Sequence, residues 1–228
     1  MEKRTLTKAA ARAELVDAKQ RYTDMLAEFE GRCVVNNAAK DGFLYLMAIP
    51  VIYSAWEAYF KMTMSICLKR LHSQSRKANR CDASYVALWL QKEGFVTGFL
   101  QNLLNAMNPG TDISKKLNMG KFKALADFSR DMAIWHSKPV PAQRFEDLVM
   151  THSNINRAVV EANAEIIGLD LNSLNFGRLD ELLSRRNDIS HGGLVALPQE
   201  ATVQALFGYV KNLISDFHCA VLRWLSCN

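Results

Sequence analysis

The feature that most constrains the fold is the helical spacing of apolar residues, which is clearest over residues 199–226. Apolar side chains recur there three and four positions apart along one face: Val203, Leu206, Phe207, Val210, Leu213, Ile214, Phe217, Val221 and Trp224. This period is that of an amphipathic α-helix. No segment shows the sustained alternation of apolar and polar residues that is typical of a half-buried strand. The sequence therefore predicts an all-α protein.

Further helices are expected over 5–30, 41–72, 83–107, 121–135, 142–150, 156–167 and 176–190. A chain of 228 residues is long enough to bury one substantial core. We therefore expect residues 1–228 to form a single domain, a helical bundle with additional helices. Residues 108–153 fit this pattern least, and they are expected to form a helical insertion.

Composition and charge narrow the function classes. A net charge of +5 permits a polyanionic partner such as RNA without requiring one. The five cysteines are scattered without zinc-ligand spacing, which is typical of reduced thiols in a cytoplasmic protein, and we expect no metal and no cofactor. An uncharged run over 42–56 is shorter than the ~20 residues that span a bilayer. We interpret it as a buried core helix and expect no membrane partner.

Arg186 is the least expected residue of the helix predicted over 176–190. The apolar stripe of Leu179, Leu182 and Ile189 passes through its position, whereas Arg185 falls on the polar side. A guanidinium on a core-facing stripe is costly unless it is paired or lines a polar cleft. Arg186 is therefore a candidate for a functional residue.

His191 follows Arg186 by five positions, which places the two side chains about 140° apart around an ideal helix. One straight helix cannot direct both at one atom. Either the helix ends at His191, which Gly192 permits, or a second copy of the chain completes the site. Asn187 precedes His191 by four positions and could hold the imidazole in one tautomer.

Two other interpretations remain open on spacing alone. Arg186 and His191 could be cations that favour the dipole at a helix C-terminus. Arg130 and His136 also place an arginine shortly before a histidine, so the spacing does not single out one pair. Only Arg186 and His191, however, are followed by paired glycines and a long closing helix.

The run Arg186-Asn187-Asp188-Ile189-Ser190-His191-Gly192 resembles the signature of the HEPN superfamily. The segment from Ser153 to Leu183 is similar to the run before the motif in the RiboL-PSP-type group, and residues 54–59 are similar to its early acidic position. The resemblance implies a metal-independent endoribonuclease at a homodimer interface, acting as a toxin or in phage defence, with an antitoxin or defence-system protein as a further partner. The alternative is a non-catalytic helical module that binds RNA or a protein.

The resemblance also assigns roles to residues of this chain. Arg186 would bind the scissile phosphate, His191 would act as general acid or base, and Asn187 would orient the histidine. Supporting roles are expected for Glu57, Asp188 and Ser190. Glu57 either lies beside Arg186 or is a surface carboxylate. Six basic residues either steer RNA or are merely solvated: Lys69, Arg70, Arg76, Lys77, Arg80 and Arg185.

Overall fold

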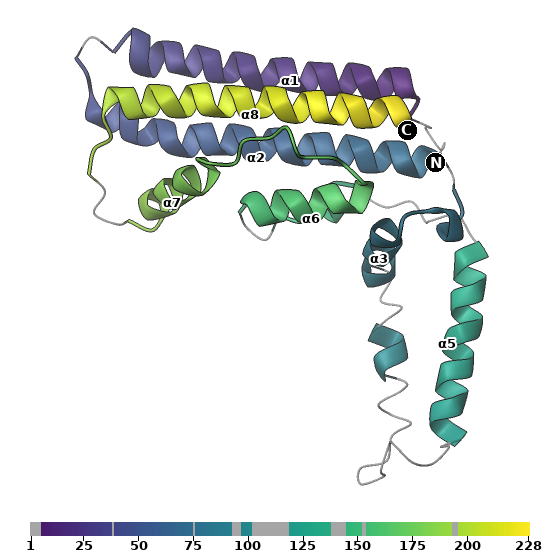
Figure 1. The fold of residues 1–228 in the computed structure, drawn as a ribbon. Coiled ribbons are helices and arrows are strands. Elements are labelled where there is room, and N and C mark those ends of the chain that lie inside the picture. Colours follow the sequence, from purple (N-terminus) through teal and green to yellow (C-terminus); the bar gives the residue numbers. More distant parts are fainter. Residues whose placement is uncertain are drawn as a thin grey trace. The chain divides into compact units, whose positions relative to one another are not determined.

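The structure is a computed structural model that describes residues 6–37, 39–74, 76–92, 97–101, 119–137, 145–151, 154–192 and 196–228. Its helices are α1 (Lys8–Glu30), α2 (Gly42–Ser73), α3 (Ala83–Lys92), α5 (Met119–Ser137), α6 (Arg157–Ile167), α7 (Leu179–Ser190) and α8 (Glu200–Cys227) (Figure 1). A π-helical turn, Gly31–Val35, continues α1, and 3-10 turns occupy Ala78–Arg80 and Phe145–Leu148. No described residue lies in a β-strand, and the all-α prediction is confirmed.

Local capping explains where several helices begin and end. The Thr7 hydroxyl accepts a hydrogen bond from the Ala10 N–H and starts α1, and Asn156 does the same for α6 through the Val159 N–H at 2.9 Å. Gly168 ends α6 with a φ of 67°, in the left-handed region that favours glycine. The limits of α6 are therefore those expected from the sequence.

The chain divides into two compact units. The first combines Met1–Ser73 with Arg144–Asn228, and the second is Gln74–Gln143. The second unit begins before the insertion that we expected over 108–153, because α3 belongs to it rather than to the bundle. The second unit also ends before residue 153, the expected end of the insertion. Leu148 and Val149 are buried in the first unit, where Phe145–Leu148 packs against α2.

The core of the first unit lies among α1, α2 and α8, which run side by side (Figure 1). Aromatic rings join α2 to α8: Phe217 lies 5.7 Å from Trp56 and 5.4 Å from Phe60, measured between ring centroids. Both α6 and α7 pack against α2. The indole of Trp224 on α8 donates a 2.7 Å hydrogen bond to the Ile167 carbonyl at the end of α6. Thus α2 is the element that positions α7.

Among the described helices, α2 alone is long and apolar enough to cross a membrane by length and composition. The side chains that make it apolar include Tyr53, Trp56 and Phe60, which are fully buried in the first unit. Pro50 lies within α2, and the helix continues on both sides of it. The uncharged run over 42–56 is the first half of this helix. It is buried on one side only, because Ile49, Ile52 and Trp56 are buried whereas Phe43, Leu44 and Met47 are exposed.

Candidate functional site

The guanidinium of Arg186 is held by neutral groups from three segments. Its Nη1 donates hydrogen bonds to the Asn154 Oδ1 at 3.3 Å and to the Asn187 Oδ1 at 2.9 Å, and its Cζ lies 5.2 Å from the centre of the Tyr53 ring. Arg186 is half-buried, and within the described residues it forms no ion pair. A fixed cation without a carboxylate partner keeps its charge available for an anionic ligand.

Tyr53 is the buried support beneath Arg186. It lies on α2, and its Oη accepts a 2.6 Å hydrogen bond from the Ile155 N–H. Burial raises the pKa of Tyr53, the carboxylate of Glu57 adds to this, and the Ile155 N–H and Arg186 act in the opposite direction. The phenol is therefore protonated at neutral pH. The bond to Ile155 ties the 154–155 segment to α2 and so places Asn154 beside Arg186.

His191 lies at the end of α7. Its N–H donates a 2.9 Å hydrogen bond to the Asn187 carbonyl, and Gly192 follows with a φ of 70°, which terminates the helix in the left-handed region. Of the two expected geometries, the structure has the helix end at His191. The imidazole is exposed, and no described contact joins it to Arg186. In one copy of the chain, the two side chains are therefore not brought together by direct contact.

The other residues of the motif differ in their contacts and exposure. The amide oxygen of Asn187 accepts from Arg186, so the described bond orients the arginine; its expected role towards His191 stays a prediction. Asp188 and Ser190 are exposed. Arg185 differs from its neighbour because it pairs with Glu181 at 3.0 Å.

Glu181 also binds Arg178 at 2.9 Å, and the two guanidinium groups, that of Arg178 first, hold the pKa of the Glu181 carboxyl below its usual value. Arg130 likewise pairs with a carboxylate, that of Asp127. Of these arginines, Arg186 is the one held by neutral partners alone. This contrast distinguishes it from Arg130, which spacing alone could not do.

Glu57 is neither paired with Arg186 nor a fully exposed surface carboxylate, the two positions expected for it. It is half-buried on α2, pairs with Lys61 one turn later and has no described ion pair with Arg186. Its charge nevertheless reaches the Tyr53 hydroxyl, one turn before it, whose pKa it raises. Glu57 therefore borders the site through Tyr53 rather than through Arg186.

The basic residues expected to steer RNA have different surroundings. Lys69 is exposed on α2, whereas Arg70 donates to the main-chain oxygens of Leu6 at 3.2 Å and Asn228 at 2.7 Å and thus connects segments of the first unit. The other three expected there are exposed in the second unit: Arg76, Lys77 and Arg80. Their role in RNA binding stays a prediction.

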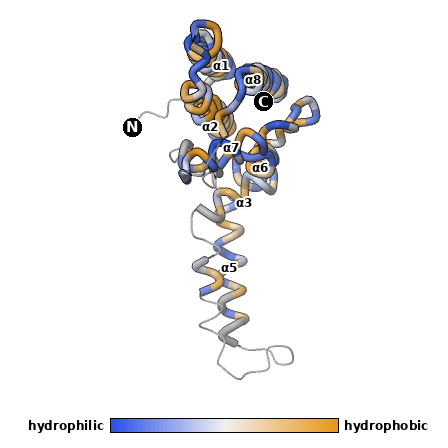
Figure 2. The backbone as a smooth tube through the Cα atoms, turned by 90° about the vertical axis from the view of Figure 1, so that its left-hand side faces the viewer, coloured by the Kyte–Doolittle hydropathy of each residue, from blue (hydrophilic) through white to orange (hydrophobic). Residues whose placement is uncertain are grey.

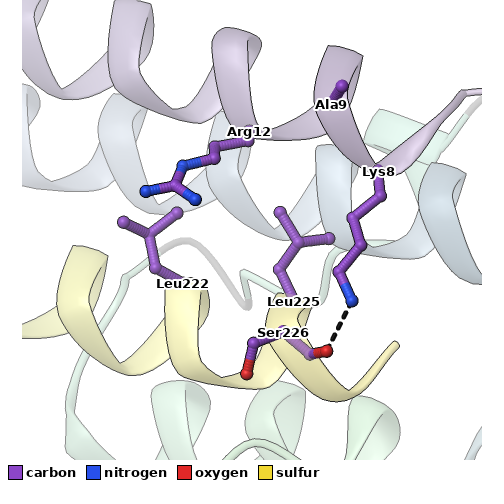
Figure 3. A pocket seen from close by; sticks show the side chains of 6 residues that line it. All are labelled: Lys8, Ala9, Arg12, Leu222, Leu225 and Ser226. Carbon is purple, nitrogen blue, oxygen red and sulfur yellow. Dashed lines mark hydrogen bonds between the residues drawn. The ribbon is translucent and has the colours of Figure 1, made fainter.

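A separate pocket of about 450 Å³ lies between the start of α1 and the end of α8 (Figure 3). Its lining combines cationic and apolar side chains, and Lys8 donates a hydrogen bond there to the Ser226 carbonyl. Neither Arg186 and its partners Tyr53, Asn154 and Asn187 nor His191 lines this pocket. Among the described residues, no three His, Cys, Asp or Glu side chains are grouped so that they could hold a metal ion.

Sequence reasoning did not predict Tyr53 and Asn154 as residues of the site. A tyrosine on an apolar helix has the pattern of a core residue, and Asn154 lies 32 positions from Arg186. The one available signal was that Asn154 falls within the segment that resembles the family before the motif.

Comparison with known proteins supplies the family. No curated protein and no solved structure matches the chain. The model of the family described as RiboL-PSP-HEPN matches residues 17–222, a range that spans both units and contains α2, Asn154 and the whole Arg186–His191 motif. The resemblance stated from the motif is thereby confirmed. The chain belongs to the RiboL-PSP-HEPN family, whose all-α HEPN domains are generally associated with RNase function.

Proposed function

We propose that the protein is a metal-independent endoribonuclease that cleaves single-stranded RNA with Arg186 and His191. The observation that carries this proposal is the state of the Arg186 guanidinium, which Tyr53, Asn154 and Asn187 fix in place without neutralising it. Preorganised cations aimed at developing charge are a large source of catalysis, because they need no reorganisation during the reaction. The N–H donors of a guanidinium match the oxygens of a phosphodiester, as they match those of a carboxylate.

The reaction would be an internal phosphoryl transfer. The ribose 2′-oxygen attacks the adjacent phosphorus while the bond from phosphorus to the 5′-oxygen breaks, which gives a 2′,3′-cyclic phosphate and a 5′-hydroxyl. Arg186 stabilises the charge that builds on the non-bridging oxygens. His191 takes the 2′-hydroxyl proton or supplies a proton to the leaving 5′-oxygen, and solvent water makes the other transfer, so that the 2′-oxygen loses one proton and the 5′-oxygen gains one. No metal ion is required by this balance.

A homodimer is part of the proposal. Arg186 is half-buried on the body of α7, His191 is exposed at its end, and no described contact joins them. A second copy would bring its own arginine and histidine to the same phosphate. Light scattering at micromolar concentration tests this: a dimer is expected, and a protein that is only monomeric would contradict it.

The decisive measurement is cleavage of end-labelled single-stranded RNA by the full chain in EDTA. Wild type is expected to cleave. Arg186→Ala should lower the rate by about 10²–10³-fold, and His191→Ala by about 10²-fold or more. An RNA with one 2′-deoxynucleotide should resist cleavage after that nucleotide, because the nucleophile is missing.

A matched control makes this test specific. Arg130→Ala removes the same charge from the other Arg–His pair; Arg130 has a carboxylate partner, Asp127, and this variant should cleave like wild type. The nuclease proposal fails if His191→Ala is as active as wild type, if wild type cleaves none of a broad RNA panel, or if cleavage requires a divalent metal.

The second candidate is a non-catalytic HEPN module that binds RNA or a protein. The exposed imidazole of His191 favours it, since no described side chain orients that ring. Binding of labelled RNA, followed by fluorescence anisotropy, separates the two functions. The binding module is supported if wild type binds RNA, if Arg186→Ala binds it with lower affinity, and if the RNA remains uncleaved in both samples.

We also propose that the protein acts in the cytoplasm as a toxin or phage-defence effector, without a membrane partner and with an antitoxin or defence-system protein that restrains it. Family membership and the Arg186 geometry support this proposal. Induced expression of wild type in bacteria should arrest growth with loss of RNA, and His191→Ala should not. Equal growth of the two strains under phage challenge and under induction would count against it.

A further inference from the structure

The pocket between the start of α1 and the end of α8 combines exposed cations with sheltered aliphatic side chains. Lys8 and Arg12 on α1 are exposed, whereas Leu225 on α8 is buried and Leu222 is half-buried. Figure 3 shows the two cationic side chains extending from α1 towards α8 and the two leucines reaching back towards α1. Positive charge and aliphatic surface therefore meet in one cavity of about 450 Å³.

The charge of Arg12 is not neutralised by any carboxylate among the described residues. The other arginine of α1, Arg21, pairs with Asp17 one turn earlier at 2.9 Å. The residue one turn before Arg12 is instead Lys8, which donates to a neutral group, the Ser226 carbonyl. Like charges four positions apart on a helix repel each other. An anion held between Lys8 and Arg12 would remove this repulsion.

A buried histidine close to the pocket experiences the same positive field. His218 lies one turn before Leu222 on α8. Burial, followed by the charges of Lys19 and Arg12 on α1, lowers the pKa of His218, and no carboxylate is among the described groups that act on it. Lys19 itself donates to a neutral group, the Ser215 hydroxyl at 3.2 Å. The cations of α1 that face this part of α8 thus have no carboxylate partners within the described residues.

We propose that this pocket binds a small amphipathic anion, a carboxylate or phosphate group carried on an aliphatic chain. Lys8 and Arg12 would hold the anionic oxygens, since a guanidinium matches the paired oxygens of either group. Ala9, Leu222 and Leu225 would cover the chain, whose burial favours binding. The described lining contains no aromatic ring on which a nucleobase could stack.

The volume limits the ligand to a small molecule. At ~30 Å³ for each water-sized group, a cavity of about 450 Å³ holds about fifteen non-hydrogen atoms, which is the size of decanoate or decyl phosphate. The pocket also lies apart from the Arg186 site, because α7 is on the opposite side of α2 from α1 in both Figure 1 and Figure 2. Binding here is therefore independent of the proposed nuclease.

Isothermal titration calorimetry with the full chain tests the proposal, with decanoate and decyl phosphate as probes. At least one of them should bind saturably below about 1 mM at physiological salt. Shortening the chain should weaken binding by up to about fourfold for each methylene removed. Decanol lacks the anion and inorganic phosphate lacks the chain, so neither should bind in this range. Phosphatidylglycerol vesicles should not bind the protein, because the pocket has room for one short chain only.

Two variants and two matched controls locate the binding in the pocket. Arg12→Gln should raise the Kd about tenfold. Ala9→Phe should weaken binding without a change of charge, because its ring would occupy the pocket. The controls Arg21→Gln and Ala27→Phe change exposed positions of α1 outside the pocket and should bind like wild type. Circular dichroism reports whether each variant folds, and Ala9→Phe provides the test should Arg12→Gln not fold.

The outcomes decide the proposal without any RNA assay. Saturable binding of either probe that weakens in Arg12→Gln and Ala9→Phe supports it, and the stronger probe identifies the head group. The proposal is overturned if neither probe binds, if decanol binds as tightly as they do, or if inorganic phosphate accounts for the whole affinity. Binding to vesicles alone overturns it as well. So does binding that is unchanged in both pocket variants, or weakened equally in the controls.

Discussion

His218 is a buried histidine on α8, and acid should destabilise the protein through it. The residue is 5% exposed, and its Nδ1 has no hydrogen-bond partner among the described residues. Burial, followed by the positive charges of Lys19 and Arg12 on α1, lowers the pKa of His218 from 6.5 to about 4. The folded protein therefore keeps this imidazole neutral at a pH where the unfolded chain protonates it.

The sign and the size follow from this difference in pKa. Well above pH 6.5 neither state binds the proton, and the contribution of His218 to stability is complete. Between pH 6.5 and about 4 only the unfolded chain binds it, so the free energy of unfolding falls as the pH falls. The loss is about 2 kcal/mol between pH 7 and pH 5, and about 3 kcal/mol once the pH is below both values.

Urea unfolding at pH 7 and pH 5 measures this loss in wild type and in His218→Gln, which cannot titrate. Carboxylates contribute equally to both proteins, so the difference between the two pH dependences isolates His218. Wild type should lose about 2 kcal/mol more than the variant over this interval. NMR titration of the imidazole, identified by its absence from the spectrum of the variant, should give a pKa well below 6.5.

The reasoning is refuted if His218→Gln loses as much stability on acidification as wild type. A pKa for His218 near its ordinary value in the folded protein would refute it equally. Either result would mean that water or a nearby acceptor solvates the imidazole in spite of its burial.

Three further predictions concern stability and are checked by urea or thermal unfolding. Gly168→Ala should lower the free energy of unfolding by about 1 kcal/mol, because the φ of Gly168 is 67°. Gly208 lies inside α8 with no atom within 4 Å of the new Cβ, so Gly208→Ala should raise it by about 0.5–1 kcal/mol. Changes of the same sign in the two variants would contradict these backbone conformations. Asn163→Ala should cost about 2 kcal/mol or more, because it leaves the Met150 N–H and carbonyl without their 3.0 Å and 2.7 Å bonds. Arg70→Ala should cost about 1–3 kcal/mol through two lost main-chain contacts, and an unchanged midpoint would exclude that role.

The fold could be predicted from the sequence where a helix carries its own signals. The apolar period of α8 and the Asn156 and Gly168 caps of α6 are local, and both helices lie where expected. Over 142–150 a helix was expected, and the described part contains only the 3-10 turn Phe145–Leu148. A short helix is marginal by itself, and here contact with α2 rather than periodicity determines the backbone.

The site could be predicted only in part for the same reason. The motif singled out Arg186 and His191 because their residue types and the closing helix lie close together in sequence. The groups that make Arg186 distinctive, the Tyr53 ring and the Asn154 amide, come from distant segments. No local pattern reports that a carboxylate is absent from the surroundings of a guanidinium, and this absence among the described residues is what separates Arg186 from Arg130.

The assembly of Arg186 from three segments has a consequence for how the protein folds. The first hairpin, α1 and α2, can form from contacts close in sequence, but Asn154 and α7 must then dock on α2 across the whole intervening second unit. Contacts of such long range form slowly, because the entropy of closing the chain must be met first. We therefore expect the guanidinium to be ordered late in folding, so that a nascent or partly unfolded chain carries the motif without the geometry that directs its charge.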